Sequence, residues 1–197
     1  KILAAVDWLA RDAAAPGPRT GVETRRALAG RAPRVPIGVA GWGEGGLLAL
    51  YSAALEPRIA AAAVSGYFSR REELWREPIY RNVFGLLREF GDAEIAQLIV
   101  PRGLVVEPAR APDVSGPPAP RAGFAGAAPG RIATPPFADV RAEVARAQRL
   151  AGPFAAAIAL TNAAPDGGSG ATEGGAGCFS DATLAEFLRR LAPADAP

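Results

Sequence analysis

The chain has 197 residues, of which 49% are hydrophobic, and this length and composition predict a single globular domain with its own core. A formal net charge of +2, with basic and acidic residues intermixed, does not indicate a nucleic-acid-binding protein, and no apolar run approaches the ~20 residues of a transmembrane helix. The absence of histidine and the presence of one cysteine, Cys178, exclude imidazole catalysis, histidine metal sites and an internal disulfide, so we expect neither a metal nor another cofactor.

The first part of the chain predicts a helix, a connector and a strand. Residues 2–14 place Ile2, Ala5, Val6 and Leu9 on one helical face, and because the chain begins inside this helix without a methionine, we expect it to be a piece of a longer protein. Residues 16–35 form a turn-rich connector with one short helix near residues 23–29. A buried strand at residues 36–40 and a helix that ends before Pro57 follow.

The middle of the chain continues the alternation of strand and helix. The apolar run at residues 59–65 favours a buried parallel strand over an alanine-rich helix. A helical stripe then predicts a helix over residues 79–90, and Asp92 is expected to cap a further short helix. Residues 103–107 predict the third strand.

The last third of the chain contains a long connection and two further elements of the same kind. Residues 108–136 are rich in Pro, Gly and Ala without periodicity, which is typical of a lid or binding loop. A helix ending at Leu150, a fourth strand at residues 154–160, a glycine-rich loop at residues 161–177 and a helix capped by Ser180 follow. The pattern predicts one α/β domain over residues 1–197, whose strands lie parallel in chain order with helices on both faces.

The stretch PIGVAGWGEGGLLALY, residues 36–51, has the layout of a strand that turns directly into a helix. Its Gly41-Trp42-Gly43-Glu44-Gly45 segment matches the spacing of the nucleophile elbow G-x-S-x-G, with glycine in place of the serine. The dinucleotide fingerprint G-x-G-x-x-G is not matched at the proper offset. A tight strand-to-helix turn of any α/β protein is the alternative interpretation.

Four stretches of the sequence together resemble the α/β-hydrolase superfamily, in particular its dienelactone-hydrolase and acetyl-xylan-esterase-like branch. They are GVAGWGEGG (38–46), VSGYF (64–68), LIVPRGLVVE (98–107) and FSDATLAEFLRRL (179–191). The resemblance implies the C-terminal half of that fold, with about four strands, and a relationship to carboxylic ester hydrolases that use a Ser–acid–His triad.

Carried onto this chain, the resemblance implies a catalytic site that has lost most of its side chains. The nucleophile position is Gly43, and the histidine is expected within residues 175–179, where none occurs. Glu107 is the candidate acid and Asp113 the second choice, whereas a solvated strand end is the structural alternative for Glu107. Cys178 has no base to activate it.

Glu44 follows the nucleophile position, and its backbone N–H at a helix N-terminus would serve as an oxyanion donor. A catalytic Glu44–Glu107 carboxylate pair is a weaker alternative. Trp42 and Tyr67 are the candidate substrate-binding residues.

Two functions follow as hypotheses. The first is a degenerate esterase-like domain that performs no triad chemistry and acts as a binding or structural module. The second is an active ester hydrolase that uses non-standard residues or a site completed by other segments. A small ester or carbohydrate ester is the expected ligand. Because the strand at 36–40 would lie at an open sheet edge, we expect pairing there with an upstream segment or with a second copy.

Overall fold

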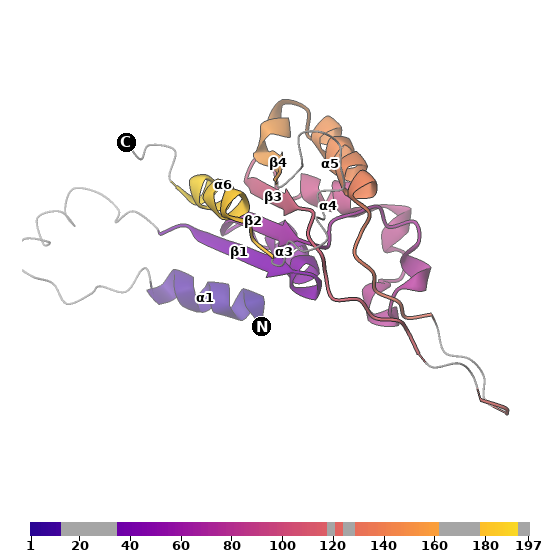
Figure 1. Ribbon diagram of the computed structural model, residues 1–197. Helices are drawn as coiled ribbons and strands as arrows, with labels where there is room; N and C mark the ends of the chain where they lie inside the picture. Colours follow the sequence, from indigo (N-terminus) through magenta and orange to yellow (C-terminus); the bar gives the residue numbers. More distant parts are fainter. Residues whose placement is uncertain (13–34, 118–120, 124–128, 162–177, 193–197) are drawn as a thin grey trace, which may run out of the picture.

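A four-stranded parallel sheet forms the centre of the computed structural model, which describes residues 1–12, 35–117, 121–123, 129–161 and 178–192 (Figure 1). The strands lie side by side in chain order, so the predicted α/β class, parallel pairing and strand order are confirmed. Within the described residues, β1 and β4 are the two edge strands. The strands are β1 (Ile37–Trp42), β2 (Ile59–Ser65), β3 (Gly103–Glu107) and β4 (Ile158–Leu160).

The two inner strands are buried on both faces, which explains their nearly continuous apolar sequences. Side chains 61–64 of β2 and 104–106 of β3 have no exposed surface. In β2 the alanines have a high helix propensity, but pairing on both sides, with β1 and with β3, overrides this local preference.

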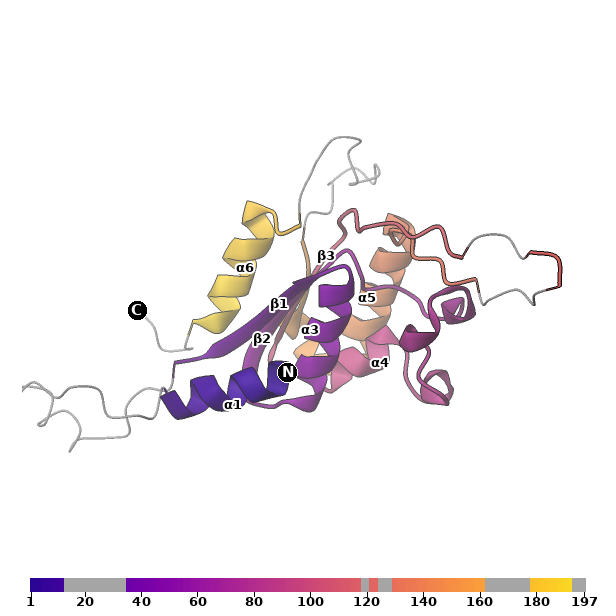
Figure 2. The same ribbon diagram turned by 90° about the horizontal axis from the view of Figure 1, so that it is seen from below.

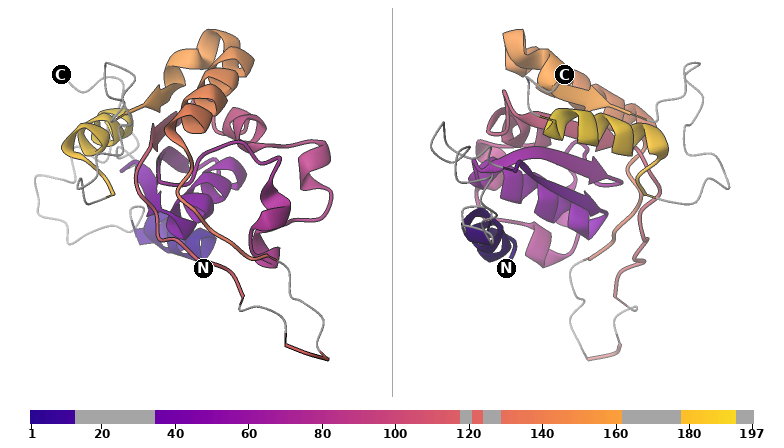
Figure 3. Two further views of the ribbon diagram at one scale, coloured as in Figure 1. Left: turned by 45° about the vertical axis from the view of Figure 1, so that its right-hand side comes forward. Right: turned by 90° about the vertical axis from the view of Figure 1, so that its left-hand side faces the viewer.

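Helices cover both faces of the sheet. The right-hand view of Figure 3 shows α3 (Glu44–Leu55) and α6 (Asp181–Leu191) on opposite sides, and Figure 2 shows α1 (Ile2–Asp12) on the side of α3. On the α3 side, α4 (Asp92–Gln97) packs against both α3 and α5 (Phe137–Ala151). A Cβ atom at Gly38 would lie 2.6 Å from the ring of Phe187, so a glycine in β1 allows α6 to approach the sheet closely.

One arginine joins the ends of three elements. Arg102 Nη1 donates to the carbonyl oxygens of Ala53 at 2.8 Å, Glu56 at 3.1 Å and Ile59 at 2.9 Å, and its Nη2 donates to the carbonyl oxygen of Leu98 at 2.8 Å. The C-terminal end of α3, the start of β2 and the chain after α4 are therefore bound to the same side chain.

The predicted helix over residues 79–90 is wrong. Only two short 3₁₀ turns form there, Ile79–Arg81 and Leu86–Arg88, after a third at Leu74–Arg76. Gly85 adopts a left-handed φ of +76°, which interrupts any helix. The apolar stripe that suggested the helix is exposed, whereas the side chain of Arg81 is buried.

Two further predictions need correction. Most of the predicted strand at 154–160 belongs to a 3₁₀ helix over Gly152–Ala157, and only residues 158–160 join the sheet, because β3 begins at Gly103 and its Leu104 already pairs with Ile158. Arg190 donates to the carbonyl oxygens of Ala156 and Ala157. Asp92 does not cap α4: Gly91 is the N-cap, and Asp92 is the first helical residue and fully buried.

The remaining local predictions are confirmed or lie outside the described residues. Ser180 caps α6, as predicted, and its Oγ accepts the N–H of Thr183 at 3.3 Å. The described part of residues 108–136 contains no helix or strand before Phe137, only an isolated bridge between Val114 and Ile132. The predicted helix at 23–29 and residues 162–177 lie outside the described residues. Among the described helices, none is both long and apolar enough to cross a membrane.

Candidate functional site

The turn between β1 and α3 has the strand–turn–helix geometry that the glycine pattern predicts. β1 ends at Trp42 and α3 begins at Glu44, so Gly43 alone joins them, at φ +55° and ψ −117°. This is a conformation that L-residues rarely adopt. Gly43 N donates to the carbonyl oxygen of Ser65 at 2.9 Å, and a Cβ atom at Gly41 would lie 1.8 Å from the carbonyl oxygen of Gly45. The close approach of Gly45 therefore requires glycine at position 41, and the positive φ favours glycine at position 43.

The space above Gly43 is covered by the chain that follows β3. A Cβ atom at Gly43 would lie 3.3 Å from Pro112 Cδ and 3.8 Å from Ala111 Cβ. Ala111 is held in place by Thr134, whose Oγ1 accepts the Ala111 N–H at 3.0 Å. Trp42 Nε1 donates to the carbonyl oxygen of Arg110 at 2.8 Å. Residues 111 and 112, which we call the roof segment, therefore lie next to Gly43, the predicted nucleophile position.

Glu107, the candidate acid, is buried rather than solvated, with 1% of its surface exposed. Its Oε2 accepts hydrogen bonds from Ser65 Oγ at 2.6 Å and from Phe179 N at 2.7 Å. Its Oε1 accepts from Ser180 N at 2.8 Å and from Thr183 Oγ1 at 2.7 Å. The structural alternative of a solvated strand end is therefore wrong: the carboxylate ties β2 and β3 to the N-terminus of α6.

The charge of Glu107 is stabilised by these donors. Burial raises the pKa of its carboxyl, but the hydrogen bonds from Ser65, Ser180 and Thr183 outweigh burial and hold the pKa below its ordinary value. Because each oxygen already accepts two hydrogen bonds, the carboxylate serves α6 as an anionic partner at its N-terminus.

Glu44, the residue after the nucleophile position, uses its side chain elsewhere. Its Oε1 accepts from Tyr80 Oη at 2.9 Å and from Arg81 Nε at 2.9 Å, and Arg81 Nη2 lies 2.6 Å from the same oxygen. The hydrogen bonds of Glu44 and Glu107 have no partner in common, so these bonds do not join the two carboxylates as a pair.

Arg81 begins a chain of alternating charges that sequence reasoning missed. Arg81 also binds Glu77 at 2.9 Å, Glu77 binds Arg71 at 3.1 Å, and Arg71 Nε binds Asp92 Oδ2 at 3.0 Å. Both arginines and Asp92 are buried, and the other carboxylate oxygen of Asp92 has no hydrogen-bond partner among the described residues. Burial raises the pKa of Asp92, against the opposing effect of Arg71.

Tyr67, a candidate substrate-binding residue, lies inside this charge network. The guanidinium of Arg71 lies 4.2 Å from the ring centroid and that of Arg81 5.5 Å, so both make cation–π contacts with the ring. Only 4% of Tyr67 is exposed, and burial raises the pKa of its phenol well above the ordinary value.

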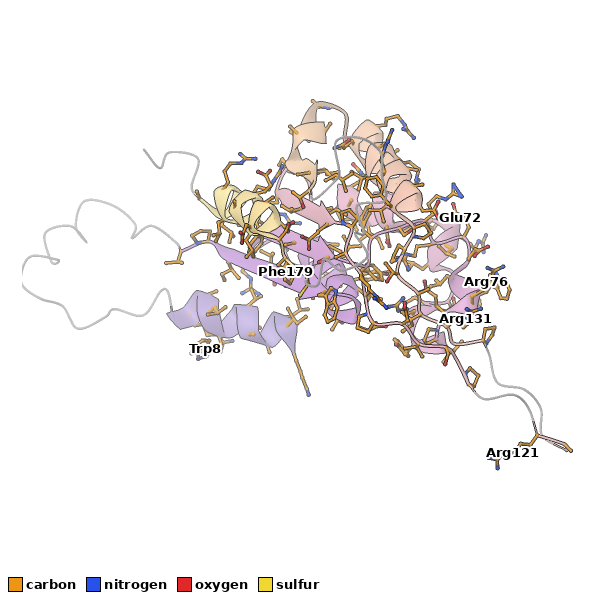
Figure 4. The ribbon with its side chains drawn as sticks, in the orientation of Figure 1. Trp8, Glu72, Arg76, Arg121, Arg131 and Phe179 are labelled. Atoms are coloured by element: carbon orange, nitrogen blue, oxygen red, sulfur yellow. The ribbon has the colours of Figure 1, made fainter. Side chains whose placement is uncertain are left out.

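A cavity of about 590 Å³ opens beside this network, at the carboxyl end of β2 where Gly66 follows the strand. The carboxyl ends of parallel strands are the usual place for ligand sites in open α/β sheets. Tyr67 belongs to its lining and Trp42 does not. Figure 4 shows Glu72, Arg76 and Arg131 gathered at this end of the molecule. The charged lining residues are Arg70, Arg71, Arg76, Arg81, Arg131, Glu72, Glu73, Glu77 and Asp139.

The remaining candidates lie apart from one another. Asp113 Oδ1 accepts the N–H of Thr134 at 3.1 Å, so Asp113 helps to hold the roof segment. Cys178 is half-buried, next to Phe179, which has a positive φ of 64°. No cluster of three metal-ligating side chains is present in the part of the chain that the structure describes.

Comparison of the chain with protein-family models, with curated proteins and with solved structures gives no match. The site therefore has to be interpreted from its own geometry.

Proposed function

We propose that this chain is an α/β-hydrolase-like domain, related to esterases, that performs no triad chemistry and acts by binding a ligand. The observation that carries the proposal is the combination of Gly43 at the elbow with the roof segment next to it. The turn at φ +55° and ψ −117° resembles the backbone of a nucleophile elbow but carries no nucleophilic side chain, and an added Cβ there would lie 3.3 Å from Pro112 Cδ and 3.8 Å from Ala111 Cβ.

The hydrogen bonds of Glu107 support the same proposal. An acid of a triad orients an imidazole, but this sequence contains no histidine. Instead, the four hydrogen bonds of Glu107 run to β2 and to the start of α6. The carboxylate at the acid position thus serves the fold.

The cavity at the end of β2 supplies the binding surface in this proposal. Its volume is that of a small-molecule site, and its lining combines arginines, carboxylates and hydroxyl groups with Tyr67. Such a lining suits a polar ligand with several hydrogen-bonding groups, for which a carbohydrate ester is the expected class.

The test has two measurements on the purified chain. We expect turnover of a short-chain aryl ester at the rate of buffer alone, and turnover well above background that an active-site-directed probe abolishes would refute the loss of chemistry. In a second measurement, saturation-transfer NMR with acetylated xylose is expected to show binding that Arg131→Ala weakens. Absence of binding to the wild-type chain would refute this ligand class.

The hypothesis of an active hydrolase with unusual residues gains no support from the site. Its best candidate is Glu44, and that carboxylate is bound by Tyr80 and Arg81.

A further inference from the structure

Residues 75–90 expose an unusual concentration of large apolar side chains. Phe84 is fully exposed, at 102% of its reference area, and Ile79 is 74% exposed. Soluble monomers rarely present large contiguous apolar patches, and those that do usually bind something. We call these side chains the apolar segment; they are Trp75, Ile79, Tyr80, Val83, Phe84, Leu87 and Phe90.

The segment contributes little to the core of its own chain. Its secondary structure is limited to 3₁₀ turns, and Arg81 is its buried residue. Short turns of this kind do not compensate for the entropy of ordering a chain unless they bury apolar surface. A partner that covers the apolar segment would supply the missing burial.

We propose that the apolar segment is the contact surface of a symmetric dimer, covered by the same segment of a second copy of this chain. The exposed parts of its seven side chains amount to roughly 800 Å², which is the area per partner of a standard protein interface. The segment is also rich in aromatic residues, which dominate the energetics of such interfaces.

The charged residues beside the apolar segment favour a second copy of the chain over other partners. Arg88 and Glu89 are adjacent and exposed, and neither forms an ion pair within the described residues. A two-fold axis beside them places Arg88 of one copy opposite Glu89 of the other, twice, as an isologous contact requires. An anionic membrane would instead select a basic rim, whereas here Arg76 is balanced by Glu73 and Arg88 by Glu89.

The experiment measures the mass of the chain by sedimentation equilibrium from low to high micromolar concentration. We expect a dimer that Ile79→Asp/Phe84→Asp weakens at least about 30-fold, because two apolar contacts at the centre of the interface are lost. Leu55→Asp, on α3 and 71% exposed, is the matched control and leaves the dimer unchanged. Since both changed side chains are exposed, the variant keeps the wild-type circular dichroism spectrum.

A charge exchange tests the partner directly. Arg88→Glu alone weakens the dimer because two glutamates then face each other, and Arg88→Glu/Glu89→Arg restores it. A wild-type chain that stays monomeric at every concentration would overturn the proposal. So would a dimer that survives Ile79→Asp/Phe84→Asp, which would place the contact elsewhere, such as the edge of β1. A monomer that co-sediments with phosphatidylserine vesicles would assign the segment to lipid instead.

Discussion

Ser65 and Glu107 occupy paired positions in β2 and β3, and Ser65 Oγ donates a 2.6 Å hydrogen bond to Glu107 Oε2. The pair lies at the carboxyl end of the sheet, where Gly66 N also donates to the carbonyl oxygen of Glu107 at 2.9 Å. From this position the carboxylate reaches the N-terminus of α6. A single ionised side chain therefore connects two strands with the last helix.

Glu107→Gln is expected to lower the free energy of unfolding by about 2–4 kcal/mol at neutral pH. A carboxamide presents one acceptor where the carboxylate presents two, so buried donors from Ser65 or from α6 lose a charged partner. Urea denaturation followed by circular dichroism measures the change. Glu72→Gln, on an exposed side chain with no hydrogen bond in the described residues, is the control and should change stability by less than about 0.5 kcal/mol.

Wild type and Glu107→Gln should also differ in how their stability depends on pH. Because the pKa of Glu107 is lower in the folded state, its stabilising contribution is complete above the pKa of the unfolded chain and is lost as the pH falls through the folded pKa. The stability difference between wild type and Glu107→Gln should therefore shrink as the pH is lowered below the ordinary glutamate pKa of 4.5. A difference that grows on acidification would contradict the assignment.

Gly43→Ser is expected to destabilise the fold by about 1–3 kcal/mol and to gain no esterase activity. The serine would have to adopt a positive φ and place its Cβ 3.3 Å from Pro112, and no histidine is present to accept its proton. Gly45→Ser is the matched control, because a Cβ atom there meets nothing within 4 Å. Thermal unfolding should separate the two variants, and equal melting temperatures would argue against strain at Gly43.

Arg71→Met is expected to cost about 3–5 kcal/mol, because it leaves the buried carboxylate of Asp92 without its counter-ion. Adding Asp92→Asn should recover part of the loss, since the uncompensated charge then disappears. Arg76→Met changes an exposed arginine that forms a surface ion pair with Glu73 and an exposed contact with the ring of Trp75, and it should cost less than about 1 kcal/mol. Chemical denaturation of these three variants and of Asp92→Asn alone tests this, and additive effects of Arg71→Met and Asp92→Asn would contradict the coupling.

The sheet could be predicted because the sequence features that mark its strands lie within or next to each strand. The first three strands are short apolar runs with Pro or Gly at their ends, and the turn at Gly43 follows from the spacing of four glycines. The prediction of a helix at 79–90 was wrong because it assumed that the periodic apolar residues pack on the core. In the structure most of these side chains are exposed, so no core contact stabilises a helix there. Nothing in the spacing of Ile79, Val83 and Leu87 reveals which side of the chain is covered.

The candidate site was predictable only in part, since its partners come from distant segments. The sequence places Glu107 at a strand end, but its burial depends on Ser65 and on the start of α6, far away in the chain. The network of Arg71 and Arg81 was missed for the same reason. A weak signal was present, because the stretch from Arg71 to Arg81 carries arginines and glutamates among aromatic residues, a pattern typical of ion pairs that pack on rings.

Arg102 couples the local unfolding of α3, β2 and α4. Its guanidinium donates to carbonyl groups at the end of α3, at the start of β2 and after α4, so fraying of any of these ends breaks a bond to the side chain that also restrains the others. Native-state hydrogen exchange should accordingly find the amides of α3, β2 and α4 exchanging as one cooperative unit with a common opening free energy. In Arg102→Leu the three elements should exchange at separate rates, with α4, the shortest of them, opening first.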